Sequence, residues 1–263
     1  TEIYINQGVH ESRIAIVEAG VVLSALHDAV EAQGLKFPVT FGARGSAMIG
    51  GILSTNAGGS NVLRYGNARA QCLGLEAVLP SGEVLNLMSE LHKDNSGYDL
   101  RDLLIGAEGT LGLITKAVLK LVPAPGAYAT ALVAVPSLDD ALSLLNRLQE
   151  ATGGAVEAFE YMPKSYIEQH RAVFPDYRLP YAEGHEVNVL VEVGAIQPRD
   201  VTPGPDGAVP VVGFLEDVLG DFAEAGQVLD AVVARNEDQR RRMWSLREAA
   251  AEVGLARKPI VIN

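Results

Sequence analysis

The segment 42–60 carries the residue types in this chain that are best suited to hold a ligand closely. It reads Gly-Ala-Arg-Gly-Ser-Ala-Met-Ile-Gly-Gly-Ile-Leu-Ser-Thr-Asn-Ala-Gly-Gly-Ser, with six glycines among small hydroxyl and amide residues. Because glycine has no Cβ, backbone N–H groups in such a run can approach phosphate oxygens or ring edges directly. The spacing matches neither the phosphate loop of NTPases nor the G-x-G-x-x-G of dinucleotide folds. We therefore predict a phosphate-bearing cofactor held in another manner, with a glycine-rich surface turn as the alternative.

A second segment, 99–115, favours the cofactor site over the surface turn. A short apolar helix pattern runs there into Glu108-Gly-Thr-Leu-Gly112 and then into a β-rich stretch. Two further motifs, Leu63-Arg-Tyr-Gly66 and Lys93-Asp-Asn-Ser-Gly-Tyr98, lie between the two segments. In this order the motifs resemble the second half of the PCMH-type FAD-binding domain of FAD-linked oxidases in the vanillyl-alcohol oxidase superfamily. The branch they resemble holds glycolate oxidase flavoprotein subunits, D-lactate dehydrogenases and D-2-hydroxyglutarate dehydrogenases.

The resemblance implies FAD as cofactor, with backbone amides of both segments against its pyrophosphate and isoalloxazine. The matching positions in the first segment are Gly42, Ala43, Arg44, Gly45, Ser46, Ala47, Met48, Thr55, Asn56, Ala57 and Gly58. The matching positions in the second segment are Glu108, Gly109, Thr110, Leu111, Gly112, Leu113 and Ile114. A weaker alternative is a ligand-free structural domain whose glycines serve only as turns.

Composition limits the classes of partner. The formal net charge of -12 and the pI near 4.9 argue against nucleic-acid binding, because phosphate backbones attract basic surfaces. The single cysteine, Cys72, leaves no pair for a disulfide, and the five histidines show no metal-binding spacing, so we predict no metal. No apolar stretch approaches the roughly 20 residues of a membrane helix, and we expect a cytoplasmic or matrix-like location.

Apolar spacing predicts the elements that must position the first two segments. Before residue 123 they are a strand at 13–18, a helix at 22–33, a β-hairpin over 73–87 and a strand at 113–122. Pro123-Ala-Pro-Gly126 cannot continue regular structure and marks a boundary. We therefore place a first domain at residues 1–123, which the resemblance identifies as the second, incomplete part of an FAD-binding domain.

The remainder, residues 127–263, is predicted to form a second domain. Its elements are a strand at 128–135, a helix at 137–150, a strand at 155–161, a short helix from 163, a strand at 186–193, a helix at 212–223 and a strand at 227–234. This order predicts an α+β fold with a ferredoxin-like antiparallel sheet and helices on one face. In the resembling family this is the C-terminal substrate or cap domain, here incomplete.

The segment 238–248 is the second candidate site. On a helix, Arg240, Trp244 and Arg247 fall at i, i+4 and i+7, so one face would offer guanidinium groups and an aromatic wall to a carboxylate. The alternative is a solvated helix with exposed arginines and Trp244 in the core. The resemblance assigns Arg247 to the carboxylate of a 2-hydroxy acid. It also leads us to expect a Lys-His motif where Ile262-Asn263 stands, which leaves the role of Lys258 open.

These predictions combine into an FAD-dependent oxidoreductase that oxidises a D-2-hydroxy acid to the 2-oxo acid by hydride transfer to flavin N5. The acid would be of the lactate, glycolate or 2-hydroxyglutarate type. The alternative is a noncatalytic flavin-binding or assembly subunit of a glycolate-oxidase-like complex. Proteins of the resembling family extend past both ends of this sequence, so we expect an internal part of a longer protein. The general base and the electron acceptor stay open, and a homodimer or related subunits fit the resemblance.

Overall fold

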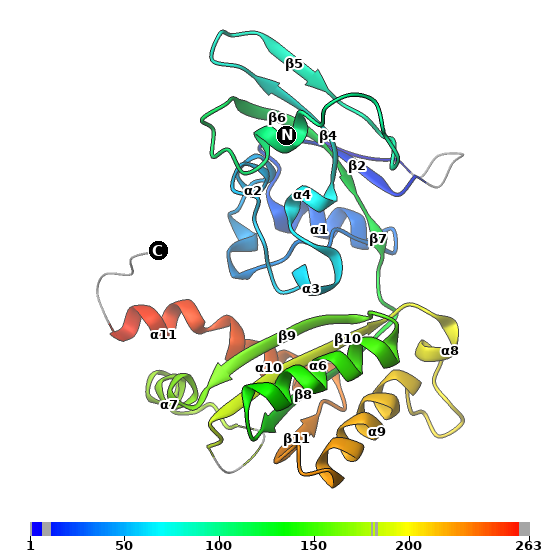
Figure 1. Ribbon diagram of the computed structural model, residues 1–263, viewed down its shortest axis with the longest axis vertical. Coiled ribbons are helices and arrows are strands. Elements are labelled where there is room, and N and C mark those ends of the chain that lie inside the picture. The colour runs from blue at the N-terminus through cyan, green and yellow to red at the C-terminus, as the bar shows by residue number, and fades with distance from the viewer. Residues whose placement is uncertain (1, 7–11, 180, 182–183, 258–263) are drawn as a thin grey trace. The chain divides into compact units, whose positions relative to one another are not determined.

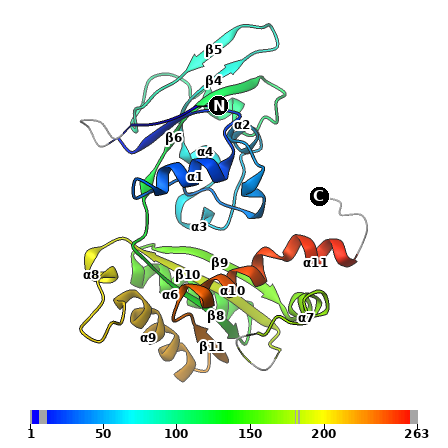
Figure 2. The ribbon, with the colours of Figure 1, turned by 180° about the vertical axis from the view of Figure 1, so that it is seen from behind.

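The computed structural model describes residues 2–6, 12–179, 181 and 184–257. The chain divides into two compact units, Thr1–Ala124 (unit 1) and Pro125–Asn263 (unit 2). Each unit consists of an antiparallel sheet with helices packed against it (Figures 1 and 2). Each unit has its own buried clusters of apolar side chains.

Unit 1 has a five-stranded antiparallel sheet in the order β1-β2-β6-β4-β5. Its strands are β1 (Ile3–Asn6), β2 (Ile14–Glu18), β4 (Cys72–Val78), β5 (Val84–Leu87) and β6 (Leu113–Lys120). The predicted hairpin is confirmed as the β4–β5 pair. The strand predicted at 113–122 ends at Lys120, because the chain after Leu121 pairs with a different strand. There β7 (Val122–Pro123) joins β3 (Leu35–Lys36) in a separate two-stranded sheet.

The helices of unit 1 pack on one face of its sheet. They are α1 (Leu23–Glu31), the 3-10 helix η1 (Gly42–Gly45), α2 (Ile49–Ser54), α3 (Val62–Tyr65), α4 (Ala68–Gln71) and α5 (Arg101–Leu104). The apolar stripe of α1, formed by Leu23, Leu26 and Val30, is buried in the main cluster together with Ile49 and Leu53 of α2. The cluster fixes α2, and with it the first glycine-rich segment, against the sheet.

Unit 2 has a four-stranded antiparallel sheet in the order β11-β8-β10-β9. The strands are β8 (Ala127–Val135), β9 (Val156–Pro163), β10 (Val187–Ala195) and β11 (Asp230–Val233). Numbered along the chain, the order is fourth, first, third, second, so the ferredoxin-like prediction is confirmed. The helices are α6 (Leu138–Thr152), α7 (Lys164–Val173), α8 (Pro198–Val201), α9 (Pro210–Glu224), α10 (Glu237–Glu248) and α11 (Ala250–Arg257).

The prediction that helices cover only one face of this sheet is wrong. Helices α6 and α9 pack on the face that carries the alternating valines of β10, such as Val189 and Val191 (Figure 1). On the opposite face, Leu190 and Leu132 pack with residues of α7 and α10, including Leu246 (Figure 2). The second face is covered because its strand positions are also apolar and would otherwise be exposed to water.

Glu192 holds α10 on this second face. The residue is only 3% exposed, so its charge needs partners within the protein. The carboxylate accepts hydrogen bonds from Nε (2.7 Å) and Nη2 (2.8 Å) of Arg240. Trp244 Nε1 (2.7 Å) and the Thr130 hydroxyl (2.6 Å) donate to the same group. Burial alone would lower the pKa of Arg240, but the hydrogen bonds and charge of Glu192 outweigh it and raise that pKa. The guanidinium also lies over the Tyr128 ring, 4.2 Å from its centroid.

Replacing Glu192 by Gln should destabilise unit 2 strongly, because Arg240 keeps its charge in a largely buried position with only the half-exposed Glu237 left as a counterion. We expect a loss of about 2–3 kcal/mol in the free energy of unfolding, less than for a fully buried pair because Arg240 is partly exposed. Urea unfolding followed by circular dichroism measures it. Glu186→Gln is the matched control, since Glu186 pairs with Lys164 in solvent and should change stability by less than about 1 kcal/mol. Equal losses of stability in the two variants would contradict the role of Glu192 in holding α10.

Candidate functional site

The first glycine-rich segment is fixed by backbone hydrogen bonds to the corner between β2 and α1. The amide of Ile49 donates to the Val21 carbonyl (2.9 Å), and that of Gly50 donates to the Ala19 carbonyl (2.8 Å). Beside it opens a mostly apolar hollow of about 380 Å³. Its lining residues are Phe41, Ala47, Met48, Gly51, Ile52, Thr55, Ala57 and Gly58. The hollow therefore gathers five of the predicted positions, from both ends of this segment.

Two of the six glycines in this segment are required by packing within the protein. A Cβ at Gly59 would lie 2.0 Å from the Thr40 carbonyl oxygen, and one at Gly50 would lie 2.7 Å from the Ala19 Cβ. Real Cβ atoms do not come this close to another heavy atom, so neither position can carry a side chain without a shift of its neighbours. These two glycines thus serve the fold, as the surface-turn alternative supposes.

Three other glycines, by contrast, face open space. A Cβ would have no heavy atom within 4 Å at Gly42, Gly45 or Gly51, and none of the three has a positive φ. Gly51 lies inside α2, where glycine is about 0.5–1 kcal/mol less favourable than alanine. Neither backbone conformation nor packing explains glycine at these positions. Close approach of a group from outside the chain does explain it.

The second segment lies directly against the first. The amide of Gly106 donates to the Leu53 carbonyl (3.1 Å), and that of Glu108 donates to the Ser54 carbonyl (2.9 Å). These bonds join the turn at 106–108 to the end of α2. The structure thus brings together residues 55–58 and the turn that begins at Glu108.

The predicted residues of the second segment differ in exposure. Residues 108–111 are exposed, and Leu113 is 68% exposed. Gly112 is buried, and a Cβ there would lie 3.0 Å from the Val78 carbonyl oxygen. Ile114 belongs to the main cluster of unit 1, so its side chain points away from any ligand. Only the backbone of these last two residues is suited to contact a cofactor.

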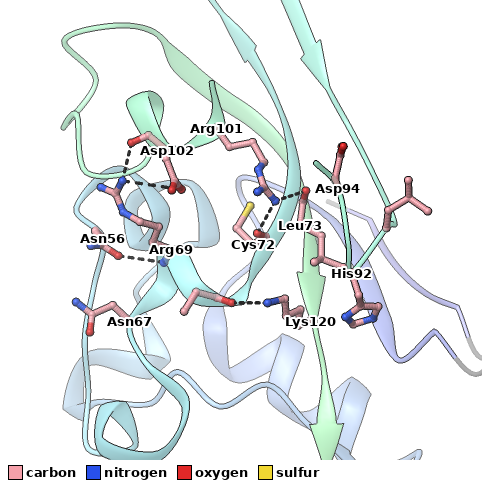
Figure 3. A pocket seen from close by; sticks show the side chains of 12 residues that line it. Asn56, Asn67, Arg69, Cys72, Leu73, His92, Asp94, Arg101, Asp102 and Lys120 are labelled. Carbon is pink, nitrogen blue, oxygen red and sulfur yellow. Dashed lines mark hydrogen bonds and ion pairs between the residues drawn. The ribbon is translucent and has the colours of Figure 1, made fainter. Parts of the chain in front are cut away.

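A polar hollow of about 460 Å³ lies beyond the end of α4 (Figure 3). Its cations serve the backbone: Arg69 donates to the carbonyls of Asp102 and Ile105, Lys120 to that of Ala70, and Arg101 to those of Cys72 and Leu73. Arg101 also binds Asp99, and this hydrogen bond lowers the pKa of the carboxyl group. Burial raises the pKa of the Cys72 thiol to about 12, so it is protonated at neutral pH and unsuited to nucleophilic chemistry.

On α10 all three predicted residues, Arg240, Trp244 and Arg247, already bind carboxylates of the protein itself. Arg240 and Trp244 bind the buried carboxylate of Glu192, so they do not form an open site for a ligand. Arg247 donates from Nε to Glu160 of β9 (2.6 Å), and its side chain is 37% exposed. Within the described part of the chain its two terminal nitrogens make no further hydrogen bond.

Sequence reasoning missed the partners of these predicted residues. Phe41 and Gly51 line the hollow but were not assigned to the cofactor. Glu160 and Glu192 were also missed, although each is an acid inside a largely apolar strand, which is a signal for a buried partner. The departures noted at Lys258 and Ile262-Asn263 lie outside the described residues.

The described residues offer neither a cluster of metal ligands nor a membrane-spanning helix. No three His, Cys, Asp or Glu side chains among the residues that the structure describes are grouped so that they could hold a metal ion. No helix in this described part is long and apolar enough to cross a membrane.

Two protein families match this chain. Residues 5–88 match the FAD binding domain family, and residues 124–263 match the family of FAD linked oxidases, C-terminal domain. The second match covers more than half of the chain, and the two follow one another in the order of the two units.

Curated relatives match over nine-tenths of the chain. It is 38% identical to a D-2-hydroxyglutarate dehydrogenase of Xanthomonas citri pv. viticola over 91% of this chain and 48% of that protein. It is 37% identical to the mitochondrial D-2-hydroxyglutarate dehydrogenase of Bos taurus over 92% of this chain and 42% of the relative. The chain thus spans about half the length of these relatives.

A solved structure of alkyldihydroxyacetonephosphate synthase is similar in fold, with a TM-score of 0.65 at 17% identity, over 95% of this chain and 43% of that one. At this identity the likeness concerns the fold alone. The predicted resemblance is confirmed by the family matches and by the curated relatives. The chain belongs to the FAD-linked oxidases.

Proposed function

We propose that the protein oxidises a D-2-hydroxy acid to the 2-oxo acid with FAD as the oxidant, and that D-2-hydroxyglutarate is the first substrate to test. The observation that carries the proposal is the 37–38% identity, over nine-tenths of the chain, to two D-2-hydroxyglutarate dehydrogenases. Lactate and glycolate are the smaller acids of the same class. The noncatalytic flavin-binding subunit is the outcome to be distinguished by experiment.

The chain's own residues fit FAD at the hollow beside α2. The open space at Gly42, Gly45 and Gly51 lets a flat or phosphate-bearing group approach the backbone, and Phe41 and Met48 give the hollow an apolar wall. The exposed turn at 108–111 would hold the cofactor from the adjoining segment. When bound, FAD supplies the acceptor for the hydride that leaves the hydroxyl-bearing carbon.

Arg247 is the residue we assign to the substrate carboxylate. Glu160 occupies its Nε, which leaves Nη1 and Nη2 as a planar pair that matches the two oxygens of a carboxylate. The same contact fixes the orientation of the guanidinium before the substrate binds, which lowers the entropy lost on binding. Arg247 would therefore orient the acid rather than move a proton.

The remaining assignments concern the whole protein. We propose a cytoplasmic location and a homodimer or an assembly with related subunits. The two units would act as the FAD-binding part (residues 1–123) and the substrate or cap part (residues 127–263) of the enzyme.

Anaerobic addition of D-2-hydroxyglutarate to the purified holoprotein should bleach the flavin absorption band, because the substrate reduces the cofactor. The L-enantiomer should leave the band unchanged. D-Lactate and glycolate, tested in parallel, rank the acids by the rate of bleaching. A flavin band that persists with every acid would favour the noncatalytic subunit over the enzyme.

Arg247→Gln should lower kcat/KM for the hydroxy acid by about 10- to 100-fold, because a hydrogen bond to a charged group contributes about 1.5–3 kcal/mol. The effect should appear mainly in KM, and steady-state kinetics with an artificial electron acceptor measure it. Arg241→Gln is the control on the same helix, since the Arg241 side chain is 72% exposed and pairs with Glu237. Unchanged kinetics in the Arg247 variant would remove this residue from the substrate site.

Gly51→Ala should stabilise the apoprotein by about 0.5–1 kcal/mol and weaken FAD binding, because the added methyl favours the helix but occupies the hollow. Gly213→Ala is the matched control: Gly213 also lies inside a helix, α9, with open space around a Cβ. It should stabilise similarly and leave the FAD dissociation constant unchanged. If Gly51→Ala binds FAD as tightly as the wild type, the hollow does not hold the cofactor.

A further inference from the structure

Arg69 joins the two segments that we assign to FAD. Its guanidinium donates from Nη1 to the Asp102 carbonyl (2.7 Å) and from Nη2 to the Ile105 carbonyl (2.6 Å). Its own amide donates to Oδ1 of Asn56 (3.0 Å). Figure 3 shows Arg69 between Asn56 and Asp102, with the bonds to these two residues drawn. One residue of α4 thus contacts the end of the first segment and the start of the second.

The carbonyls that Arg69 binds need such a partner. Asp102 and Ile105 lie in and just after the four-residue helix α5, and the last carbonyls of a helix have no helical donor. The guanidinium supplies two donors in one plane, which suits two carbonyls fixed by the same turn. Arg69 therefore determines where the chain leaves α5 and enters Gly106.

Gly106 is shaped to admit this arginine. Its φ is +85°, and a Cβ there would lie 3.1 Å from Arg69 Nη2 and 3.4 Å from the Asn56 Cβ. The guanidinium and Asn56 thus pack directly against the Gly106 backbone. From Gly106 the chain continues to Glu108, and the amides of both residues bind the end of α2.

The two segments also hold non-glycine residues in the left-handed region, with φ of +49° at Asn56 and +51° at Glu108. Non-glycine residues adopt this conformation rarely, and it persists where the surroundings fix it. At Asn56 the bond from the Arg69 amide is part of that fixation. At Glu108 the preceding turn, which Arg69 holds through the Ile105 carbonyl, contributes to it.

We propose that Arg69 is a positioning residue that preorganises both FAD-contacting segments, although it lines the polar hollow and not the hollow beside α2. The inference rests on the proposed function, because it supposes that FAD contacts residues 55–58 and 108–112. Preorganised segments bind a ligand more tightly because less order must be created on binding. Loss of the guanidinium should therefore weaken FAD binding while the apoprotein stays folded.

The test compares Arg69→Ala, Arg69→Lys and Lys120→Gln in the holoprotein. Arg69→Ala should bind FAD about 10- to 100-fold more weakly, because part of the order that the two lost hydrogen bonds gave to the segments must then be created on binding. It should also change the visible circular dichroism of the remaining bound flavin. Lysine can restore one of the two bonds and should be intermediate. Added ethylguanidinium should partly restore FAD affinity in Arg69→Ala, which a general loss of stability would not allow.

Lys120→Gln is the control for charge. Lys120 lines the same hollow and binds only the Ala70 carbonyl, away from both segments, so its loss should leave FAD affinity within about twofold. An equal loss in this variant would mean that the cations act by long-range attraction to the anionic cofactor and would overturn the inference. Unchanged FAD affinity and dichroism in Arg69→Ala would also overturn it. A wild-type protein that binds no FAD would instead refute the proposed function.

Discussion

The backbone contact between the end of α2 and the turn at 106–108 is the constraint on which unit 1 depends. Segments far apart in the chain meet there through two amide-to-carbonyl bonds, from Gly106 to Leu53 and from Glu108 to Ser54. Because the two bonds use only the backbone, neither occupies a side chain of the adjoining turns, and residues 108–111 stay exposed. The rest of the unit, including the sheet and the cluster around α1, holds these two chain segments at bonding distance.

The glycines of the first segment show how such a site differs from an ordinary loop. Gly50 and Gly59 are required by neighbours within the protein, whereas Gly51 weakens its own helix without any internal reason. A protein tolerates a locally unfavourable residue where function requires it. The open space at Gly51 is therefore better evidence for a ligand than the number of glycines in the segment.

The order of elements in unit 2 could be predicted because each strand and helix has its own apolar period. The covered second face could not, since the partner of a helix depends on contacts between distant parts of the chain. The sequence of β10 nevertheless indicated that both faces are buried. Its valines occupy one face, and Asn188, Leu190 and Glu192 alternate with them on the other. Similarly, the motifs indicated both candidate segments, but not which glycines face Thr40 or Ala19, because that depends on the folded backbone.

Two of the arginines of α10 show why spacing alone does not identify a substrate-binding residue. Arg240 and Arg247 lie on one side of the helix, and each binds a glutamate on the same face of the sheet. Glu192 lies opposite Ala158 of β9, and Glu160 lies opposite Leu190 of β10. The Glu192 carboxylate is buried and engages Arg240 through two nitrogens, which fixes the helix; Glu160 engages only Nε of Arg247. The first pair thus secures the helix, and this leaves the second arginine able to present its terminal nitrogens to an acid.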